Sequence, residues 1–355
     1  MFFGSDNQLS EQRGGGMKKT TIADVARLAN VSKSTISQYL NKRYDHMSEE
    51  TRKKIEEAIR ELNYYPNILA RSLKQKTTYT IGVVVANILH VFSTNVIRCI
   101  EDFFHEHGFH VIVCNADDEP EKERRYIEML RAKQVDGIII FPTGGNIDLY
   151  EQMLDEQYPV VFMDRTIENL EIETILLDNK RAAQLAVNHF VEQGYERIAI
   201  VTTSILRKIT PRIERIQGYK EALEYNGIEV NPNYIKSVDS ESLADALDEL
   251  FQYKPSPQAI LAGNDIVLMA TLKFIHQRNL KIPDDVAVIG IDHVPFAEFY
   301  IPPITIVAQP AREMAQEASR RLLQRIKREE TARQEPLIKR FAPTLIVGSS
   351  SIRPL

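Results

Sequence analysis

The sequence predicts an all-α module at the N-terminus, followed by an α/β core built as two doubly wound lobes. Two short helical patterns meet at a tight corner within residues 21–42. From residue 79 onwards, short runs rich in Val and Ile alternate with helical segments, which is typical of a buried parallel sheet. That alternation restarts at residues 197–202, so we expect two lobes of similar design.

The composition is ordinary for a globular protein of two or three domains, with 355 residues, 43% hydrophobic and 26% charged. No apolar run approaches the roughly 18–20 residues of a membrane span, and the start lacks the apolar stretch of a signal peptide. We therefore expect a cytoplasmic protein without a membrane partner. Its two cysteines, Cys99 and Cys114, should be reduced and lie in core segments.

Residues 1–16 are set apart from the fold by the three glycines that precede Met17. We interpret Met17 as the natural start and residues 1–16 as an extra, disordered segment. The run "RGGGM" is what a purine-rich ribosome-binding site would encode if it were translated in frame, and a cloning remnant is the alternative.

Positive charge is concentrated in residues 17–76, which hold 13 Lys and Arg against 7 Asp and Glu, although the chain has a net charge of −5. A basic module joined to an acidic body indicates a polyanion partner for the first part only.

The first two helices have clear start and stop signals. Thr21 is a suitable N-cap, and Asp24 can complete its capping box. Asn30 tolerates the left-handed backbone at the corner, and Ser32 can cap the second helix, which should run to about Leu40. The apolar stripe of the first helix is expected to be Ile22, Val25, Ala26, Leu28 and Ala29.

A third helix is expected from Ser48 to about Leu62, and Pro66 prevents it from continuing further. Residues 68–74 make barely two further turns, which are marginal alone and should form only against a packing partner. We therefore expect an α-helical domain over 17–65, a hinge and linker over 66–78, and the core over 79–355.

The core should divide into a first lobe of about 79–176 and 307–340 and a second lobe of about 177–306 and 341–355. Predicted strands lie within 79–86, 110–116, 136–141, 159–164, 197–202, 258–265, 286–292 and 304–310, and late segments should cross between the lobes. Predicted helices cover about 93–107, 120–133, 146–156 and 311–328.

Six stretches between Lys18 and about Pro354 are distinctive in sequence, order and spacing: "TIADVARLANVSKSTISQYLN", "NYYPNILARSLK", "RIERIQGYKEAL", "AGNDIVLMA", "VAVIGIDHV" and "YIPPITIVAQP". Together they resemble signature stretches of the lac-repressor/galactose-repressor family of bacterial transcription regulators. The resemblance implies a helix-turn-helix DNA-binding domain before a periplasmic-binding-protein-like core. It also implies a nucleoid-associated repressor of carbohydrate catabolism genes that binds double-stranded operator DNA as a homodimer.

The alternatives are a sugar-binding protein or a sugar-metabolising enzyme with a two-lobed α/β fold. The sequence has no Gly-rich phosphate loop, no metal-spaced His/Cys cluster and no nucleophile elbow, so we expect neither an enzyme nor a cofactor or metal. The basic N-terminal module argues against a sugar-binding protein alone.

The resemblance places Lys33, Ser34 and Gln38 at the main base-reading positions of the second helix, which lies in the major groove. Lys can donate to guanine, and Gln can pair bidentately with adenine. Many family members carry Arg where this chain has Gln38, so the preferred base should shift away from guanine. Phosphate contacts are expected from Thr21, Ser32, Thr35, Ser37 and Asn41. For Thr21 and Ser32, helix capping is the favoured role and phosphate contact a second use.

The segment over 68–74 matches the family's hinge helix, whose leucine wedges into the minor groove. The matching residues here are Leu73, the wedge, Ala70, which would let two hinge helices approach, and the capping Asn67. A C2 dimer would then read a pseudo-palindromic operator.

A small effector is expected between the lobes, because ligands of open α/β sheets bind at the carboxyl ends of strands. The residues implied by the resemblance are Phe92, Ser93, Asp164, Arg165, Arg215, Asn264, Asp292 and Gln309. Asp, Asn and Arg suit sugar hydroxyls. Helix capping is the alternative for strand-end Asp and Asn, and it is favoured for Asp265. Arg165 could instead pair with Asp164 or Asp178, and Arg215 should start its helix.

The cations available to the cleft, Arg165, Arg207, Lys208, Arg212 and Arg215, favour an anionic sugar or sugar acid. The stretches "VSKSTISQYLNKR" and "NILHVFST" resemble the ketodeoxygluconate-repressor branch, which makes 2-keto-3-deoxygluconate a candidate. A purine is disfavoured because "KSVDSES" lacks an aromatic residue. Whether the effector releases or promotes DNA binding stays open, and release is favoured for a catabolic repressor.

Overall fold

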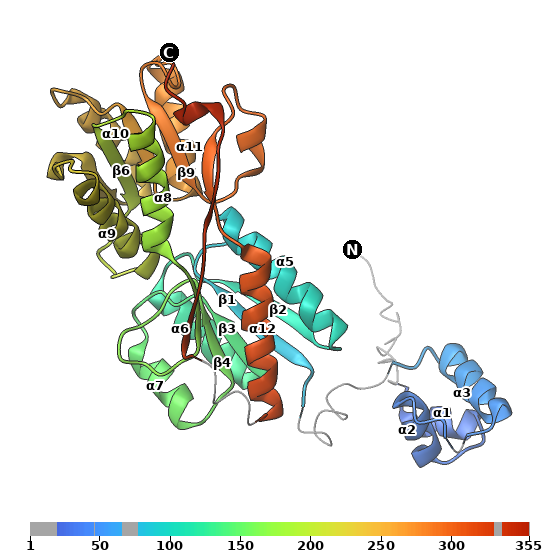
Figure 1. Ribbon diagram of the computed structural model, residues 1–355. Helices are drawn as coiled ribbons and strands as arrows, with labels where there is room; N and C mark the ends of the chain where they lie inside the picture. The colour runs from blue at the N-terminus through green and yellow to red at the C-terminus, as the bar shows by residue number, and fades with distance from the viewer. Residues whose placement is uncertain (1–19, 46, 66–76, 330–335, 355) are drawn as a thin grey trace, which may run out of the picture. The chain divides into compact units, whose positions relative to one another are not determined.

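The fold is that of a computed structural model, which describes residues 20–45, 47–65, 77–329 and 336–354. The chain separates into two compact units, Met1–Lys76 and Thr77–Leu355 (Figure 1). The predictions for residues 1–16 and for Asn67, Ala70 and Leu73 lie outside the described residues. Within the described part, no helix is both long and apolar enough to cross a membrane.

The first unit holds three helices, α1 (Ile22–Leu28), α2 (Lys33–Leu40) and α3 (Glu49–Glu61). The predicted N-caps Thr21, Ser32 and Ser48 precede them, and Asn30 turns the corner with φ 53°. The three helices pack around a common core that contains one fully buried side chain from each, namely Val25, Ile36 and Ile55. The prediction that Leu28 faces inward is wrong, since it is 45% exposed. Leu28 lies roughly 110° around α1 from the centre of the buried face.

The first lobe contains a parallel sheet in the order β11-β5-β4-β3-β1-β2. Its strands are β1 (Thr80–Val85), β2 (His110–Asn115), β3 (Gly137–Ile140), β4 (Val160–Met163), β5 (Thr174–Leu177) and β11 (Ile338–Phe341). The helices of this lobe are α5 (Val91–Glu106), α6 (Pro120–Ala132), α7 (Ile147–Asp155) and α12 (Ala311–Lys327).

Side chains of this sheet alternate between two cores, as the two-residue period of a strand requires. Val83 and Ile139 belong to one core with Phe104 of α5, whereas Val84 and Ile138 belong to another with α6 and α7. Helices therefore cover both faces of the sheet (Figure 1). Of the two cysteines, Cys114 is buried as predicted, but Cys99 on α5 is only half-buried.

The second lobe has the sheet order β12-β10-β9-β8-β6-β7, in which only the pairing of β12 with β10 is antiparallel. Its strands are β6 (Ile198–Thr203), β7 (Ile235–Val238), β8 (Ala259–Ala262), β9 (Ala287–Ile291), β10 (Thr305–Ala308) and β12 (Thr344–Ile346). Its helices are α8 (Asn179–Glu192), α9 (Thr210–Tyr225), α10 (Leu243–Gln252) and α11 (Asp265–Gln277), with 3-10 turns at Pro232–Tyr234, Ser240–Ser242, Pro295–Glu298 and Ser349–Ser351.

The chain passes between the two lobes after β5, after β10 and between β11 and β12 (Figure 1). The late segments therefore do cross back, as expected from the sequence. Residues that follow β1, β3 and β4 meet residues that follow β8, β9 and β10 around one pocket. The crossings thus place the carboxyl ends of both sheets at a single cleft.

Candidate effector site and DNA-reading helix

The inter-lobe cleft contains a cavity of about 40 Å³. All eight predicted effector residues line it, namely Phe92, Ser93, Asp164, Arg165, Arg215, Asn264, Asp292 and Gln309. Because ligand pockets usually have several hundred Å³, the cleft is closed around its polar groups. A sugar could enter only if the lobes first moved apart.

Asp292 is the most constrained acid of the cleft. It follows β9, is 4% exposed and has a left-handed backbone with φ 98°. Gln309 donates a hydrogen bond to its carboxylate from the end of β10. Burial raises the pKa of Asp292 to about 6, although the nearby Arg215 acts in the opposite direction. Asp292 therefore has a strained backbone and a buried carboxylate that can accept a further hydrogen bond from a ligand.

Arg215 lies in the middle of α9, so the prediction that it starts its helix is wrong. The helix begins at Thr210 because Pro211 fits a first helical turn, where its missing N–H costs no hydrogen bond. The buried guanidinium donates from Nε to Asn179 Oδ1 at 2.9 Å and from Nη1 to the Gly263 carbonyl at 2.5 Å. Two fixed acceptors thus hold Arg215 at the pocket wall.

Asn264 takes the capping role that was favoured for Asp265 from the sequence. Asn264 is the N-cap of α11, accepting from the Val267 N–H at 2.9 Å, while it still lines the pocket. Asp265 instead reaches across the cleft, where its carboxylate lies 2.6 Å from His90 Nδ1 and accepts from the Val91 N–H at 2.8 Å. The capping prediction for Asp265 is therefore wrong, because its carboxylate joins the second lobe to the first.

His90 was not predicted from the sequence, although it lines the pocket. Burial alone would lower the pKa of His90, but the hydrogen bond and charge of Asp265 raise it above its ordinary value. The pKa of Asp265 is correspondingly lowered by His90 against the effect of burial. An ion pair therefore closes this side of the cleft.

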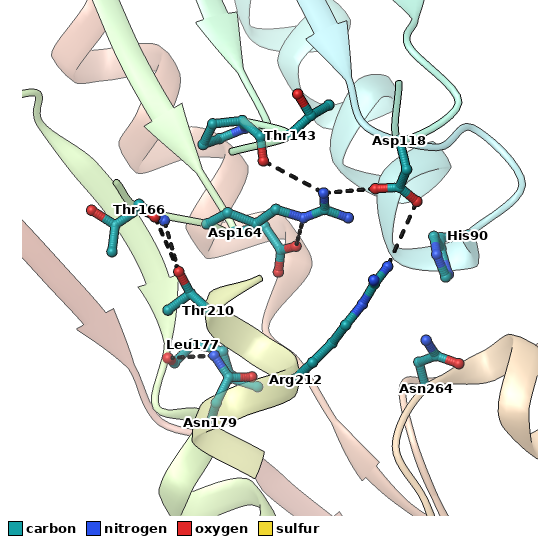
Figure 2. A network of polar contacts seen from close by, with 12 residues as sticks. His90, Asp118, Thr143, Asp164, Thr166, Leu177, Asn179, Thr210, Arg212 and Asn264 are labelled. Carbon is teal, nitrogen blue, oxygen red and sulfur yellow. Dashed lines mark hydrogen bonds and ion pairs between the residues drawn. The ribbon is translucent and has the colours of Figure 1, made fainter. Parts of the chain in front are cut away.

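Asp118 forms a second connection between the lobes and was also missed (Figure 2). Its Oδ1 lies 2.7 Å from Arg165 Nη1 within the first lobe, and its Oδ2 lies 3.6 Å from Arg212 Nη2 of the second lobe. Burial opposes ionisation, yet these two arginines lower the pKa of Asp118. The only sequence signal was a second acid directly after the strand, Asp117-Asp118.

Arg165 also lies 3.7 Å from Asp164, as one alternative anticipated, whereas Asp178 caps α8 by accepting from the Arg181 N–H. Burial raises the pKa of Asp164, an effect that Arg165 partly offsets. A third inter-lobe contact joins Thr210 Oγ1 to both the N–H and the carbonyl of Thr166 at 3.2 Å (Figure 2).

Not every expected cation reaches the pocket. Arg165, Arg212 and Arg215 line it, but Arg207 donates to the Asp118 carbonyl and Lys208 is exposed. The three lining arginines are also engaged by acids or carbonyls of the protein. The sequence therefore overestimated the positive charge that the cleft offers to a ligand.

On α2, the expected base-reading residues Lys33, Ser34 and Gln38 are exposed. Ser32 caps the helix, accepting from the Thr35 N–H at 3.1 Å. The helix sequence KSTISQYL contains no acidic residue. The outer face of α2 is therefore polar and carries no negative side chain that would repel the phosphate backbone of DNA.

The remaining expected phosphate contacts lie at the ends of the first two helices. Thr21 donates from its N–H and its hydroxyl to the Asp24 carboxylate at 3.0 and 2.7 Å. Asn41 Nδ2 donates to the Ser37 carbonyl at 2.7 Å. Thr21 thus takes part in the capping arrangement that was favoured for it from the sequence.

A two-lobed core with a polar cleft, preceded by a helix-turn-helix unit, defines the class of ligand-responsive transcription regulators. Comparison with protein families matches residues 21–67 to bacterial regulatory proteins of the lacI family. Residues 78–344 match the periplasmic binding proteins and sugar-binding domain of the LacI family. The chain belongs to the LacI family, and it is a DNA-binding transcription repressor with a sugar-binding effector domain, not an enzyme.

Among curated relatives, the probable transcriptional regulator EndR of Paenibacillus polymyxa is 46% identical over 89% of this chain and 93% of its own. The transcriptional regulator KdgR of Bacillus subtilis (strain 168) is 35% identical over 89% and 94%. Among solved structures, the lac repressor dimer bound to operator and the anti-inducer ONPF has a TM-score of 0.81 and 26% identity, covering 95% of this chain and 100% of that one. A complex of the regulator CelR with cellobiose has a TM-score of 0.69 and 28% identity over 93% and 99%.

Proposed function

We propose that this protein represses genes of carbohydrate catabolism by binding a pseudo-palindromic operator as a homodimer, and that a small sugar or sugar acid in the cleft controls it. Residues 17–65 would form the DNA-binding domain, 66–78 the hinge and linker, and 79–355 the effector-binding and dimerisation core. The observation that carries the proposal is the set of buried polar side chains that line the cleft, Arg215 from α9 and Asn264 and Asp292 from two strand ends. Buried, directional groups of this kind suit a ligand rich in hydroxyls.

The effector candidates follow from the relatives. KdgR is a relative and the sequence resembles its branch, so 2-keto-3-deoxygluconate is the sugar acid to test first. The regulator CelR is similar in structure and is known in complex with cellobiose, which makes cellobiose the neutral counterpart.

At the DNA end, we assign base reading to Lys33, Ser34 and Gln38 and phosphate contacts to Thr21, Ser32, Thr35, Ser37 and Asn41. Asn67, Ala70 and Leu73 would act in the minor groove, with Leu73 as the wedge. The protein would work at the nucleoid of the bacterial cytoplasm. An effector that binds the closed lobes better than the open ones shifts their populations, and release from the operator is the proposed outcome.

The decisive experiment is a gel shift at physiological salt with DNA from upstream of the protein's own gene, with and without the two candidate sugars. We expect a sequence-specific protein–DNA complex that dissociates when one of the two sugars is added. Lys33→Ala and Leu73→Ala should each weaken specific binding about tenfold or more, because base contacts and wedges contribute on the order of 1–3 kcal/mol.

Lys53→Ala is the matched control, since it removes the same charge from the exposed side of α3. It should weaken specific and non-specific binding by a similar small factor. A protein that gives no sequence-specific shift, or a Lys33→Ala variant that binds the operator as tightly as the parent, would contradict the proposal.

A further inference from the structure

The charged groups of the cleft are matched to one another. Arg165, Arg212 and Arg215 face four acids, which are Asp118, Asp164, Asp265 and Asp292. His90 pairs with Asp265, so this acid is neutralised separately. Among the described residues that line the cleft, each cation already has an acid or a carbonyl as its partner. A ligand carboxylate would therefore have to compete with Asp118 for Arg165 and Arg212, whereas Arg215 is held by two neutral acceptors.

Asp118 is not itself a lining residue of the pocket, but its carboxylate already pairs with two arginines that are. It bridges Arg165 and Arg212, which are the two lining arginines that an anion could otherwise engage together. Its backbone is also fixed, because its N–H donates to the Ala86 carbonyl at 2.6 Å and its carbonyl accepts from Arg207. Asp118 cannot easily turn away, so an incoming carboxylate would face a like charge in a desolvated site.

We propose that Asp118 is a specificity-determining residue that makes the cleft select uncharged sugars over sugar acids. The inference rests on the proposed effector function and narrows its ligand class. Neutral hydroxyls suit the arrangement because each can donate to Asp164 or Asp292 and accept from an arginine. An uncharged sugar therefore uses the acids as they stand, whereas a sugar acid must displace Asp118 from its arginines.

The test measures the affinity of the full-length protein for matched pairs in which a CH2OH group is replaced by a carboxylate, namely glucose with glucuronate and cellobiose with cellobiouronate, together with 2-keto-3-deoxygluconate. Isothermal titration calorimetry gives the affinities, and thermal unfolding shows that each variant is folded. For the wild type, we expect a neutral sugar to bind at least about tenfold more tightly than its acid, which corresponds to about 1.4 kcal/mol.

Asp118→Asn keeps the size of the side chain and removes its charge. We expect this variant to improve the ratio of acid to neutral affinity at least about tenfold, and Asp118→Ser should change the ratio in the same direction. Asp117→Asn is the matched control, because it removes the same charge from the preceding residue, whose carboxylate pairs with Lys122 instead of the two cleft arginines. It should leave the ratio unchanged.

The outcomes separate this inference from the proposed function. Equal affinity for acid and neutral sugars in the wild type, or an unchanged ratio in folded Asp118→Asn and Asp118→Ser, overturns the role of Asp118 while effector binding stands. Binding of no sugar and no sugar acid by wild type and variants overturns the effector function itself, and the selectivity with it.

Discussion

Asp292 in the cleft combines a strained backbone with a buried carboxylate, and hydrogen bonds from a ligand would stabilise that carboxylate. Asp292 has a left-handed backbone although it is not glycine, and its carboxylate is removed from water. Such conformations cost on the order of 1–3 kcal/mol and persist where the surrounding structure imposes them. Gln309 supplies a donor to its carboxylate. The residue is thus held ready for further donors from a ligand.

We predict that effector binding releases protons near pH 6. The pKa of Asp292 is about 6 in the free protein, so the group is partly protonated there. Ligand hydroxyls that donate to the carboxylate favour its ionised form and lower the pKa, and affinity should therefore fall as the pH drops below 6. Calorimetry in buffers of different ionisation enthalpy should show proton release at pH 6 and almost none at pH 8.

Asp292→Asn provides the control for this linkage. The asparagine cannot titrate, so any binding that remains should lose most of its proton release at pH 6. Binding that releases no protons at pH 6 in the wild type would show that Asp292 is not a ligand contact.

At the scale of secondary-structure elements, α12 ties the first lobe together through a buried charge cluster. Glu317 of α12 lies 2.8 Å from Arg321 and 3.2 Å from Lys339 of β11. Glu173, next to β5, lies 2.5 Å from Arg325. Two acids therefore connect α12 to β11, which follows it in the chain, and to the end of the segment before β5, which is distant in the sequence.

We predict that Glu317→Gln destabilises the core by about 3 kcal/mol at pH 7, because the buried Arg321 loses the acid that lies 2.8 Å away, while Glu173 lies farther off at 3.8 Å. The arginines around Glu317 outweigh burial and lower its pKa from 4.5 to about 2. Its contribution should therefore be complete above about pH 4.5 and disappear as the pH falls towards 2. Urea denaturation at pH 7 and pH 3 measures both effects.

The matched control is Glu313→Gln, which removes an exposed acid from the same helix. It should change the unfolding free energy by only a few tenths of a kcal/mol. If both variants were equally stable at pH 7, the cluster would not stabilise α12.

Elements with strong local signals could be predicted, and those defined by distant partners could not. The caps Thr21 and Ser32 and the apolar runs of β1, β3 and β9 are visible in the sequence because backbone and hydrophobic demands are local. The edge strands β7 and β11 were not predicted, since "IKSV" and "IKRF" are only partly buried and take their identity from β6 and β5.

The same distinction holds for the site. Seven of the eight predicted lining residues follow strands or begin a helix, and the fold brings such positions together, while Arg215 reaches the pocket from the middle of α9. Asp118 and His90 act through contacts with Arg212 and Asp265, which lie on the other lobe. No local sequence pattern indicates which residues pair across the cleft. The balance of charges in the cleft therefore could not be predicted from the sequence and is shown only by the structure.

At the scale of the whole molecule, side-chain contacts between the lobes include Arg207 with the Asp118 carbonyl and Arg340 of β11 with Glu214 of α9. Three further sets of contacts lie around the cleft. These are His90 and Val91 with Asp265, Asp118 with Arg212, and Thr166 with Thr210. The polypeptide also crosses between the lobes three times, so opening does not separate them. A closed state that depends on so few contacts has a population that one substitution can change.

We predict that Asp265→Ala shifts the core towards an open state, because it removes both the His90 ion pair and the acceptor of the Val91 N–H. Asp265 does not line the pocket, so direct ligand contacts remain. Small-angle X-ray scattering should show a larger radius of gyration than in the wild type, and saturating effector should restore the wild-type value. If the closed population falls to about a tenth, the apparent affinity falls about tenfold.

Asp248→Ala tests whether this effect belongs to the inter-lobe contact, since Asp248 pairs with Arg278 within the second lobe alone. Its scattering and affinity should match those of the wild type. An Asp265→Ala protein with unchanged scattering and unchanged affinity would mean that the remaining contacts suffice to close the cleft. Coupling to DNA would then have to come from the ligand's own contacts with both lobes, because an effector can shift an equilibrium only by its differential affinity for the two states.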